Sequence, residues 1–180
     1  GKKVVLNPLI TCGECNYCKN GREHLCAKRI ILGMNKPIER QGCFAELVLT
    51  PDKNIYELPS NLDIKKAPIA EPTAVALHAV ELGEETLKKS IDQSRVLIIG
   101  GGAIGLLCAL ILEKYKNCKE IVLVDPNEKR LKVCGEHLNS EALKPDNLKI
   151  KNNSFDIVFD TVGLEITRQN SIKCVNSGGV

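Results

Sequence analysis

The second half of the chain alternates apolar runs with amphipathic stretches. The apolar runs are short and nearly continuous, as expected for strands buried on both faces of a sheet, and longer helical patterns follow them. The predicted elements are strands at residues 95–99, 120–125 and 155–160 and helices at residues 103–115, 128–138 and 164–175. Strands that alternate with helices predict a parallel sheet. Residues 139–154 are polar and carry no pattern that we can assign.

The first half has a different pattern. Short β-type runs at residues 3–6, 44–49 and 54–58 are separated by loops and punctuated by prolines. Residues 60–90 form a bridge between the two halves, and within it residues 73–82 are predicted to be an apolar helix. We therefore expect a β-rich first part and an α/β second part.

Composition places this chain of 180 residues among ordinary globular proteins. Hydrophobic residues make up 43% and charged residues 26%, and no apolar run approaches the length needed to cross a bilayer. The net charge is only +3, aromatic residues are 3% and tryptophan is absent, which argues against a nucleic-acid binder. We expect neither a nucleic-acid partner nor a membrane partner.

The cysteine content is the unusual feature of the composition. The chain has nine cysteines, an odd number, which excludes a fully paired disulfide framework. Four of them, Cys12, Cys15, Cys18 and Cys26, fall within fifteen positions. Clustered cysteines without a secretory signal are typical of metal ligands in a reducing cytosol, so we predict a cytoplasmic protein.

The spacing of these four cysteines favours zinc. Gaps of two, two and seven residues let one loop place four thiolates around a tetrahedral Zn²⁺. An iron–sulfur cluster is the competing interpretation, but the bacterial ferredoxin pattern has a third gap of three residues followed by proline, whereas Ala27 follows Cys26 here. Because four sulfurs leave no open coordination position, the predicted zinc is structural. His24 lies in the same loop and is expected to be a surface side chain.

A glycine-rich turn follows the strand at residues 95–99. Its sequence contains Gly-x-Gly-x-x-Gly, formed by Gly100, Gly102 and Gly105. In a dinucleotide-binding fold the first glycine permits the tight turn, the second lets a pyrophosphate approach the backbone, and the third lets the helix pack on the strand. Ala103 and Ile104 open the helix, whose free N–H groups attract phosphate.

Asp125 occupies the position that this fingerprint reserves for a ribose-binding acid. It ends the second strand, about 20 residues after the last glycine. A carboxylate there accepts hydrogen bonds from ribose hydroxyls and repels a 2′-phosphate, which favours NAD over NADP. Lys129 and Arg130 lie just downstream and would weaken this argument if they reached the ribose. A solvated helix face is the favoured interpretation of both, and Arg130 is kept as a candidate cofactor contact.

These motifs, in this order, resemble the zinc-containing medium-chain dehydrogenase/reductase family. Residues 7–15 and 21–26 resemble its structural-zinc loop, and residues 42–46 (Gly-Cys-Phe-Ala-Glu) its Gly-x-Phe-Ala-Glu turn. Residues 70–79 resemble the interdomain helix of its polyol and threonine dehydrogenase branch, and residues 155–163 a later strand of its coenzyme domain. The resemblance extends over nearly the whole chain.

The resemblance implies a fold and a domain division. We expect part of a GroES-like β domain with a structural-zinc lobe over residues 1–75, followed by an incomplete Rossmann domain, a doubly wound parallel sheet, over residues 76–180. Family members carry a catalytic-zinc cysteine and a Gly-His-Glu segment upstream and further strands downstream. The chain is therefore expected to be an internal fragment of such an enzyme.

The resemblance also singles out Glu71. In the family, a glutamate at this position sits at the catalytic zinc, so Glu71 is both a catalytic and a metal-binding candidate. We expect its carboxylate to be buried between Pro68 and Pro72. A helix-terminal carboxylate is the alternative. His78 lies two turns further on the same helical face and is expected to be a packed histidine rather than a ligand.

The family implies a function for the complete protein. It would transfer a hydride from a secondary alcohol of a polyol or threonine-like substrate to NAD, as a homodimer or homotetramer with a catalytic zinc. A non-catalytic remnant that binds zinc and nucleotide is the alternative.

The five remaining cysteines have no metal-site spacing and are expected to be small buried hydrophobes or inert thiols: Cys43, Cys108, Cys118, Cys134 and Cys174.

Overall fold

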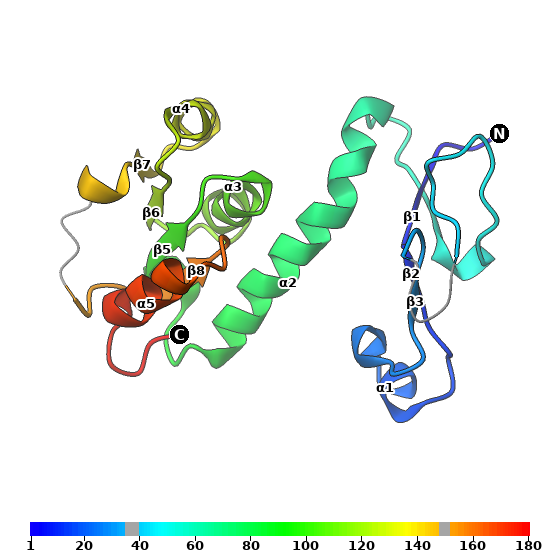
Figure 1. Ribbon diagram of the computed structural model, residues 1–180, viewed down its shortest axis with the longest axis horizontal. Helices are drawn as coiled ribbons and strands as arrows, with labels where there is room; N and C mark the ends of the chain where they lie inside the picture. The colour runs from blue at the N-terminus through cyan, green and yellow to red at the C-terminus, as the bar shows by residue number, and fades with distance from the viewer. Residues whose placement is uncertain (35–39, 148–151) are drawn as a thin grey trace. The chain divides into compact units, whose positions relative to one another are not determined.

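The computed structural model describes residues 1–34, 40–147 and 152–180. The chain divides into two compact units, Gly1–Ala70 and Glu71–Val180, which are described separately below. Figure 1 follows the chain through both units.

The first unit is built from very short strands. Strand β1 (Val4–Leu6) pairs with β4 (Ile55–Glu57), and β2 (Leu9–Ile10) pairs with β3 (Ile30–Ile31), both antiparallel. Helix α1 (Asn16–Lys19) is a single turn. The buried side chain of Asn54 ties the two sheets together, because its amide donates to the carbonyls of Asn7 and Leu9 at 2.9 and 2.8 Å.

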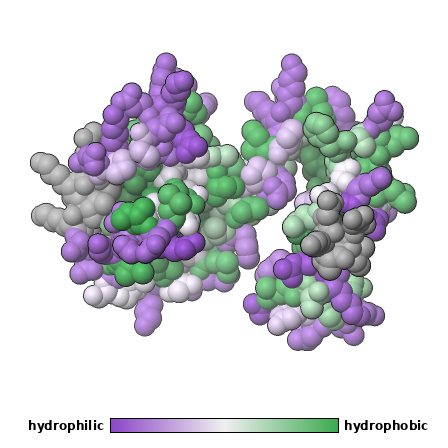
Figure 2. Space-filling view, in the orientation of Figure 1, coloured by the Kyte–Doolittle hydropathy of each residue, from purple (hydrophilic) through white to green (hydrophobic). Residues whose placement is uncertain are grey.

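The prediction of a strand at residues 44–49 of this unit is wrong. Residues 44–49 form no strand, and Phe44, Leu47 and Leu49 are at least 87% exposed. The apolar residues predicted a half-buried strand, but in the described part of the chain no neighbouring strand pairs with this segment, and a strand needs a hydrogen-bonding partner. Hydrophobic residues are correspondingly visible on the surface of this unit in Figure 2.

The second unit is an open parallel sheet with helices on both faces (Figure 1). Its strands lie in the order β7 (Glu141–Leu143), β6 (Glu120–Val124), β5 (Arg95–Ile99) and β8 (Ile157–Asp160), and all neighbours are parallel. Helices α2 (Ala70–Thr86), α3 (Ala103–Leu110), α4 (Glu128–His137) and α5 (Glu165–Cys174) complete it. The doubly wound parallel sheet that the sequence predicted is confirmed.

Alternation along the central strands decides which helix covers which face. Val96 and Ile98 of β5 belong to the cluster that contains buried residues of α2, α3 and α4. Leu97 and Ile99 belong to the opposite cluster, with Phe155 and the α5 residue Cys174. Successive strand residues point to opposite faces, so a continuous apolar run is what a sheet covered on both sides requires. The exposed side of α4 is hydrophilic in Figure 2.

Most predicted elements of this unit are confirmed within a few residues. The helix expected over residues 103–115 is observed as α3 followed by a π-helical turn, Ile111–Tyr115. The unassigned residues 139–154 contain β7 and a turn, and residues 148–151 lie outside the described residues. Short 3₁₀ turns occur at Glu23–Leu25, Asp52–Asn54, Ile64–Ile69, Ile91–Gln93 and Pro145–Asn147. No described helix combines the length and apolarity needed to span a bilayer.

Candidate functional site

The four clustered cysteines converge in the first unit. Cys12 and Cys15 precede α1, Cys18 lies within it, and Cys26 follows the next turn. All four Sγ atoms lie within 4.8 Å of one another. The Sγ of Cys12 is 3.9 Å from that of Cys18 and 3.6 Å from that of Cys26, and the sulfurs of Cys15 and Cys18 are 3.5 Å apart.

These distances fit a zinc tetrahedron. Zn–S bonds of about 2.3 Å in tetrahedral geometry place neighbouring sulfurs about 3.8 Å apart. Backbone N–H groups of Glu14 and Cys15 point at the Cys12 sulfur and lower the pKa of this thiol to about 6. Burial and the nearby Cys15 sulfur raise the pKa of Cys18 to about 11. If all four cysteines are deprotonated, thiolates this close need a cation between them, and zinc would supply it.

The glycine-rich turn lies at the carboxyl end of β5. The local geometry explains why each fingerprint position is a glycine. Gly100 has a φ of +107°, a conformation that side chains rarely allow. A Cβ on Gly105 would lie 1.8 Å from the carbonyl oxygen of Gly100, so α3 can approach the strand only without a side chain there. A Cβ on Gly102 would meet no atom within 4 Å, which leaves open space beside the first turn of α3.

Asp125 lies beside this turn, directly after β6. Its side chain is only 2% exposed, and its Oδ2 accepts a hydrogen bond from the Gly101 N–H at 2.8 Å. Its Oδ1 accepts from the Asn127 N–H at 2.7 Å. The carboxylate therefore links the turn to the start of α4, which is close to the alternative role of a helix-capping aspartate.

Arg130 is more than a solvated side chain. Its guanidinium lies 3.3 Å from Asp125 Oδ2, although 57% of the side chain is exposed. Arg130 lies on the solvated helix face that was expected, and its contact with Asp125 is the part that the sequence did not predict. The reason is geometric, because the Asn127 side chain caps α4 and holds its first turn against the end of β6.

Glu71 does not occupy the buried position expected for it. It lies in the first turn of α2 and is exposed, as is His78. Ala76, Val80 and Gly83 are the buried residues of this helix. At 100° per residue, Glu71 lies about 140° around the axis from Ala76, so its side chain points away from the core of its own unit. His78 was expected to pack between the two domains; it is not among the buried residues of this helix, and its interdomain packing stays a prediction.

The scattered cysteines follow the prediction with one exception. Cys108, Cys118, Cys134 and Cys174 are buried, and burial raises the pKa of each thiol. Cys43 is exposed, in the segment just before the expected strand that is absent. Burial was therefore the wrong expectation for Cys43.

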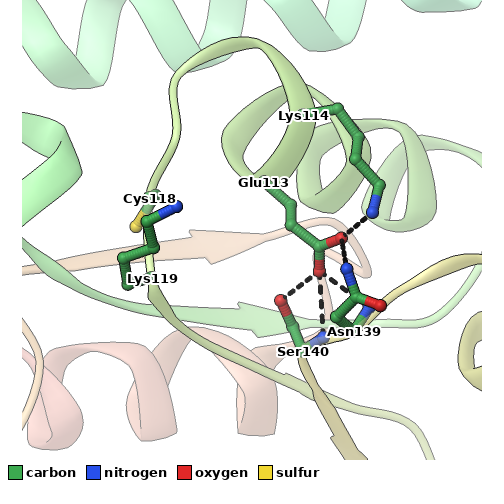
Figure 3. A pocket seen from close by; sticks show the side chains of 6 residues that line it. All are labelled: Glu113, Lys114, Cys118, Lys119, Asn139 and Ser140. Atoms are coloured by element: carbon green, nitrogen blue, oxygen red, sulfur yellow. Dashed lines mark hydrogen bonds and ion pairs between the residues drawn. The ribbon is translucent and has the colours of Figure 1, made fainter.

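A pocket of about 240 Å³ near the end of α3 contains a carboxylate that sequence analysis missed (Figure 3). Glu113 accepts hydrogen bonds from the backbone N–H groups of Asn139 and Ser140, from both of their side chains, and pairs with Lys114. Burial alone would raise its pKa, but these donors outweigh burial and lower it to about 2. Because the carboxylate is saturated with partners, we assign it a structural role in anchoring the chain that enters β7.

Thr161 is a second residue that sequence analysis did not single out. It follows β8 directly, and its hydroxyl contacts the carbonyls of Ile99 and Gly100 at the glycine-rich turn. A usable signal existed in the sequence. Residues just beyond neighbouring parallel strands gather at the same sheet edge, where α/β proteins bind ligands.

Comparisons with known proteins find similarity to dehydrogenases. Residues 1–60 match the alcohol dehydrogenase GroES-like domain. The chain is 31% identical to an L-threonine 3-dehydrogenase of Marinomonas sp. (strain MWYL1), over 99% of this chain and 52% of that protein. A second L-threonine 3-dehydrogenase, from Proteus mirabilis (strain HI4320), is 36% identical over 73% of this chain and 35% of its own length.

Solved structures of dehydrogenases are also similar to this chain. The L-idonate 5-dehydrogenase of Escherichia coli K-12 superposes with a TM-score of 0.88 at 26% identity, over 99% of this chain and 52% of that one. A protein of Sinorhizobium meliloti 1021 described as a zinc-binding dehydrogenase, bound to NADP, gives 0.82 at 28% identity over the same shares. The chain spans about half the length of the curated relatives it matches. The resemblance inferred from the sequence is confirmed.

Proposed function

We propose that this chain is part of a zinc-dependent oxidoreductase, since residues 1–60 match the alcohol dehydrogenase GroES-like domain and nearly the whole chain is similar to zinc-containing medium-chain dehydrogenases. The complete enzyme transfers a hydride from a secondary alcohol to NAD. Its substrate is a small polyol or a threonine-like hydroxy amino acid. Because the chain covers about half of its relatives, the activity is proposed for the complete protein.

One observation carries the proposal, namely that the glycine-rich turn and Asp125 lie side by side at the carboxyl edge of the parallel sheet. The open side of Gly102 receives the pyrophosphate, and the N–H groups of Ala103 and Ile104 at the start of α3 bind its oxygens. Gly100 and Gly105 bind nothing themselves. They allow the backbone to take this shape.

The ribose end of the proposed site favours NAD. Asp125 accepts the hydroxyls of the adenosine ribose on the side where Arg130 now lies. Arg130 is the movable partner of this carboxylate, since its side chain is 57% exposed whereas Gly101 and Asn127 donate from the backbone. NAD is the proposed cofactor, with Arg130 releasing the carboxylate when it binds.

The cysteine cluster holds a structural zinc in this proposal. Zinc bound by Cys12, Cys15, Cys18 and Cys26 has four protein ligands and fastens the loop around α1. It takes no part in hydride transfer. The four residues fit this ion because their sulfurs already have the spacing of a tetrahedron.

The described residues do not assemble a catalytic zinc site. In the described residues, the cysteine cluster is the only group of three or more potential ligands within ligating reach of one another, and Glu71 alone does not make a metal site. We keep Glu71 as the candidate contribution of this chain to a catalytic zinc, which in a complete enzyme acts as a Lewis acid on the alcohol oxygen. No chemical step is derived through it.

Compartment and assembly follow from the same proposal. Nine unpaired cysteines fit a reducing compartment, so we place the enzyme in the cytoplasm. We propose a homodimer or homotetramer for the complete enzyme and a small-molecule substrate as its main partner.

A second candidate function is specific enough to test. A chain that binds structural zinc and nucleotide without turnover is favoured by the exposure of Glu71 and by the lack of a second ligand group among the described residues. It differs from the first proposal in what the whole protein contains, not in the sites described above.

Native mass spectrometry of the protein from its source cells separates the two. We expect a subunit far heavier than 19.7 kDa that carries two zinc ions, with NAD⁺ reduction by polyols or L-threonine. A subunit near 19.7 kDa with one zinc and no turnover would overturn the enzyme proposal and support the remnant. A subunit without zinc would contradict both.

A further inference from the structure

The peptide unit that joins Gly100 to Gly101 is held at both ends. Its carbonyl oxygen, on Gly100, lies 3.2 Å from the Thr161 hydroxyl, and its N–H, on Gly101, lies 2.8 Å from Asp125 Oδ2. In a trans peptide the C=O and N–H point in opposite directions. Thr161 and Asp125 therefore hold one peptide plane from opposite sides.

The two residues reach the peptide from the strands that flank β5. Thr161 follows the end of β8 and Asp125 follows the end of β6, and both strands pair with β5. Each is the first residue beyond its strand, where the backbone is still fixed by the sheet. Thr161 and Asp125 thus form a clamp on this peptide, and both ends of the clamp are positioned by strands of the sheet.

The Thr161 end of the clamp is anchored twice. Its N–H donates to the Ile99 carbonyl at 3.0 Å, and its hydroxyl lies 2.9 Å from the same carbonyl and 3.2 Å from that of Gly100. One hydroxyl proton is shared between the two oxygens. The side chain is only half-buried, but its partners are the last backbone atoms before the turn.

The space around the peptide is tightly filled. A Cβ on Gly100 would lie 2.6 Å from the Thr161 hydroxyl oxygen, and the Gly100 carbonyl is the atom that excludes a side chain from Gly105. Close contacts therefore surround the turn, in addition to its hydrogen bonds.

We propose that Thr161 is a positioning residue for dinucleotide binding. It acts through the Gly100–Gly101 peptide, whose orientation sets the path of the backbone into Gly102 and the first turn of α3. A turn fixed before binding loses less conformational freedom when the pyrophosphate arrives, so the clamp raises affinity without touching the ligand. This inference rests on the proposed function, because it assumes that the turn binds a dinucleotide.

Three variants test it with ADP-ribose, the half of the cofactor that the turn and Asp125 would bind. Thr161→Val removes the hydroxyl and keeps the branched shape, and Thr161→Ser restores the hydroxyl. Thr167→Val is the matched control, because the Thr167 hydroxyl also bonds to two oxygens, those of Asp160 and Leu164 in the cap of α5. Dissociation constants are measured by calorimetry, at a temperature where circular dichroism shows every variant folded.

We expect Thr161→Val to weaken ADP-ribose binding by about fivefold, the change that corresponds to one hydrogen bond of about 1 kcal/mol. Thr161→Ser should restore most of the affinity, and Thr167→Val should leave it unchanged. A lowered melting temperature of Thr161→Val with wild-type affinity would show a merely structural role and overturn the inference. If the wild-type chain binds no ADP-ribose at all, the proposed function fails instead.

Discussion

The two units of this chain are held together in different ways. In the described residues, the first unit buries only Cys26, Leu32 and Ala67 among its hydrophobic residues, and one of these is a metal-ligand candidate. The second unit buries two clusters on the two faces of its sheet. The second unit has a hydrophobic core, whereas the first unit has a cluster of four cysteines and few buried hydrophobic residues.

The difference follows from size and strand length. None of the residues in the first unit's strands of two or three residues is fully buried, and a small unit removes too little apolar surface from water to offset the entropy of ordering its chain. A metal site compensates for this, since binding a structural zinc stabilises the fold directly. The five-residue strands β5 and β6 make such help unnecessary in the second unit.

Loss of the zinc site should have the largest effect on stability. This loss of stability should be confined to the first unit. Cys26→Ser removes the most buried ligand. Apparent zinc-binding energies of roughly 10–16 kcal/mol in zinc-finger peptides exceed the whole stability of a typical domain, so we expect the first unit to unfold. Hydrogen exchange should show protection lost over residues 1–70 and kept over 71–180.

Cys43→Ser is the matched control, because Cys43 is exposed and lies outside the cluster. It should keep both the zinc and the exchange pattern. If Cys26→Ser keeps its protection over residues 1–70, the first unit does not depend on metal and the contrast between the units fails.

A cavity in the core of the second unit should have the next largest effect on stability. Leu97 is fully buried in the centre of the sheet, so Leu97→Ala should lower the free energy of unfolding of this unit by about 2–5 kcal/mol. The zinc content should not change. Ile172→Ala on α5, at a side chain 74% exposed, is the control and should cost less than about 0.5 kcal/mol. A comparable loss from both variants would contradict the assigned core.

The smallest of the three effects concerns Glu113, and it depends on pH. Its pKa falls from 4.5 to about 2 in the folded chain, so its contribution is complete above the unfolded pKa and is lost as pH falls toward 2. The shift corresponds to at most about 3 kcal/mol, and Glu113→Gln should remove most of it at pH 7. Chemical denaturation should show that the difference in free energy of unfolding between the wild type and Glu113→Gln becomes smaller as pH falls from 7 to 3.

Glu128→Gln controls for charge alone, since this carboxylate is 77% exposed. It should leave the free energy of unfolding and its pH dependence nearly unchanged. An equal effect of the two substitutions would show that the donors around Glu113 in Figure 3 are not the source of its stability.

The glycine fingerprint and the cysteine loop were predictable because their signals are local. Gly100, Gly102 and Gly105 are demanded by one turn, and Cys12, Cys15, Cys18 and Cys26 by one loop, so spacing alone identifies them. The buried strands were predictable for a related reason, since a run that is apolar at every position fits a strand covered on both faces.

The failures share a different cause. Residues 44–49 have the composition of a strand, but pairing depends on a neighbour that a local pattern cannot supply. Glu71 was expected to be buried from its prolines, whereas the packed side of α2 is set by Ala76 and Val80. In both cases the decision lies with contacts between segments that are distant in the sequence.

By itself, the sequence determined the order of the elements, the zinc loop and the dinucleotide turn, because each is encoded within a few neighbouring residues. Only the tertiary structure decided that Thr161 and Asp125 clamp the same peptide, that Arg130 covers the carboxylate and that Glu113 anchors β7. These partners are 5 to 61 residues apart along the chain. Parallel strands bring their ends to one edge of the sheet, and side chains meet there that no sequence pattern places together.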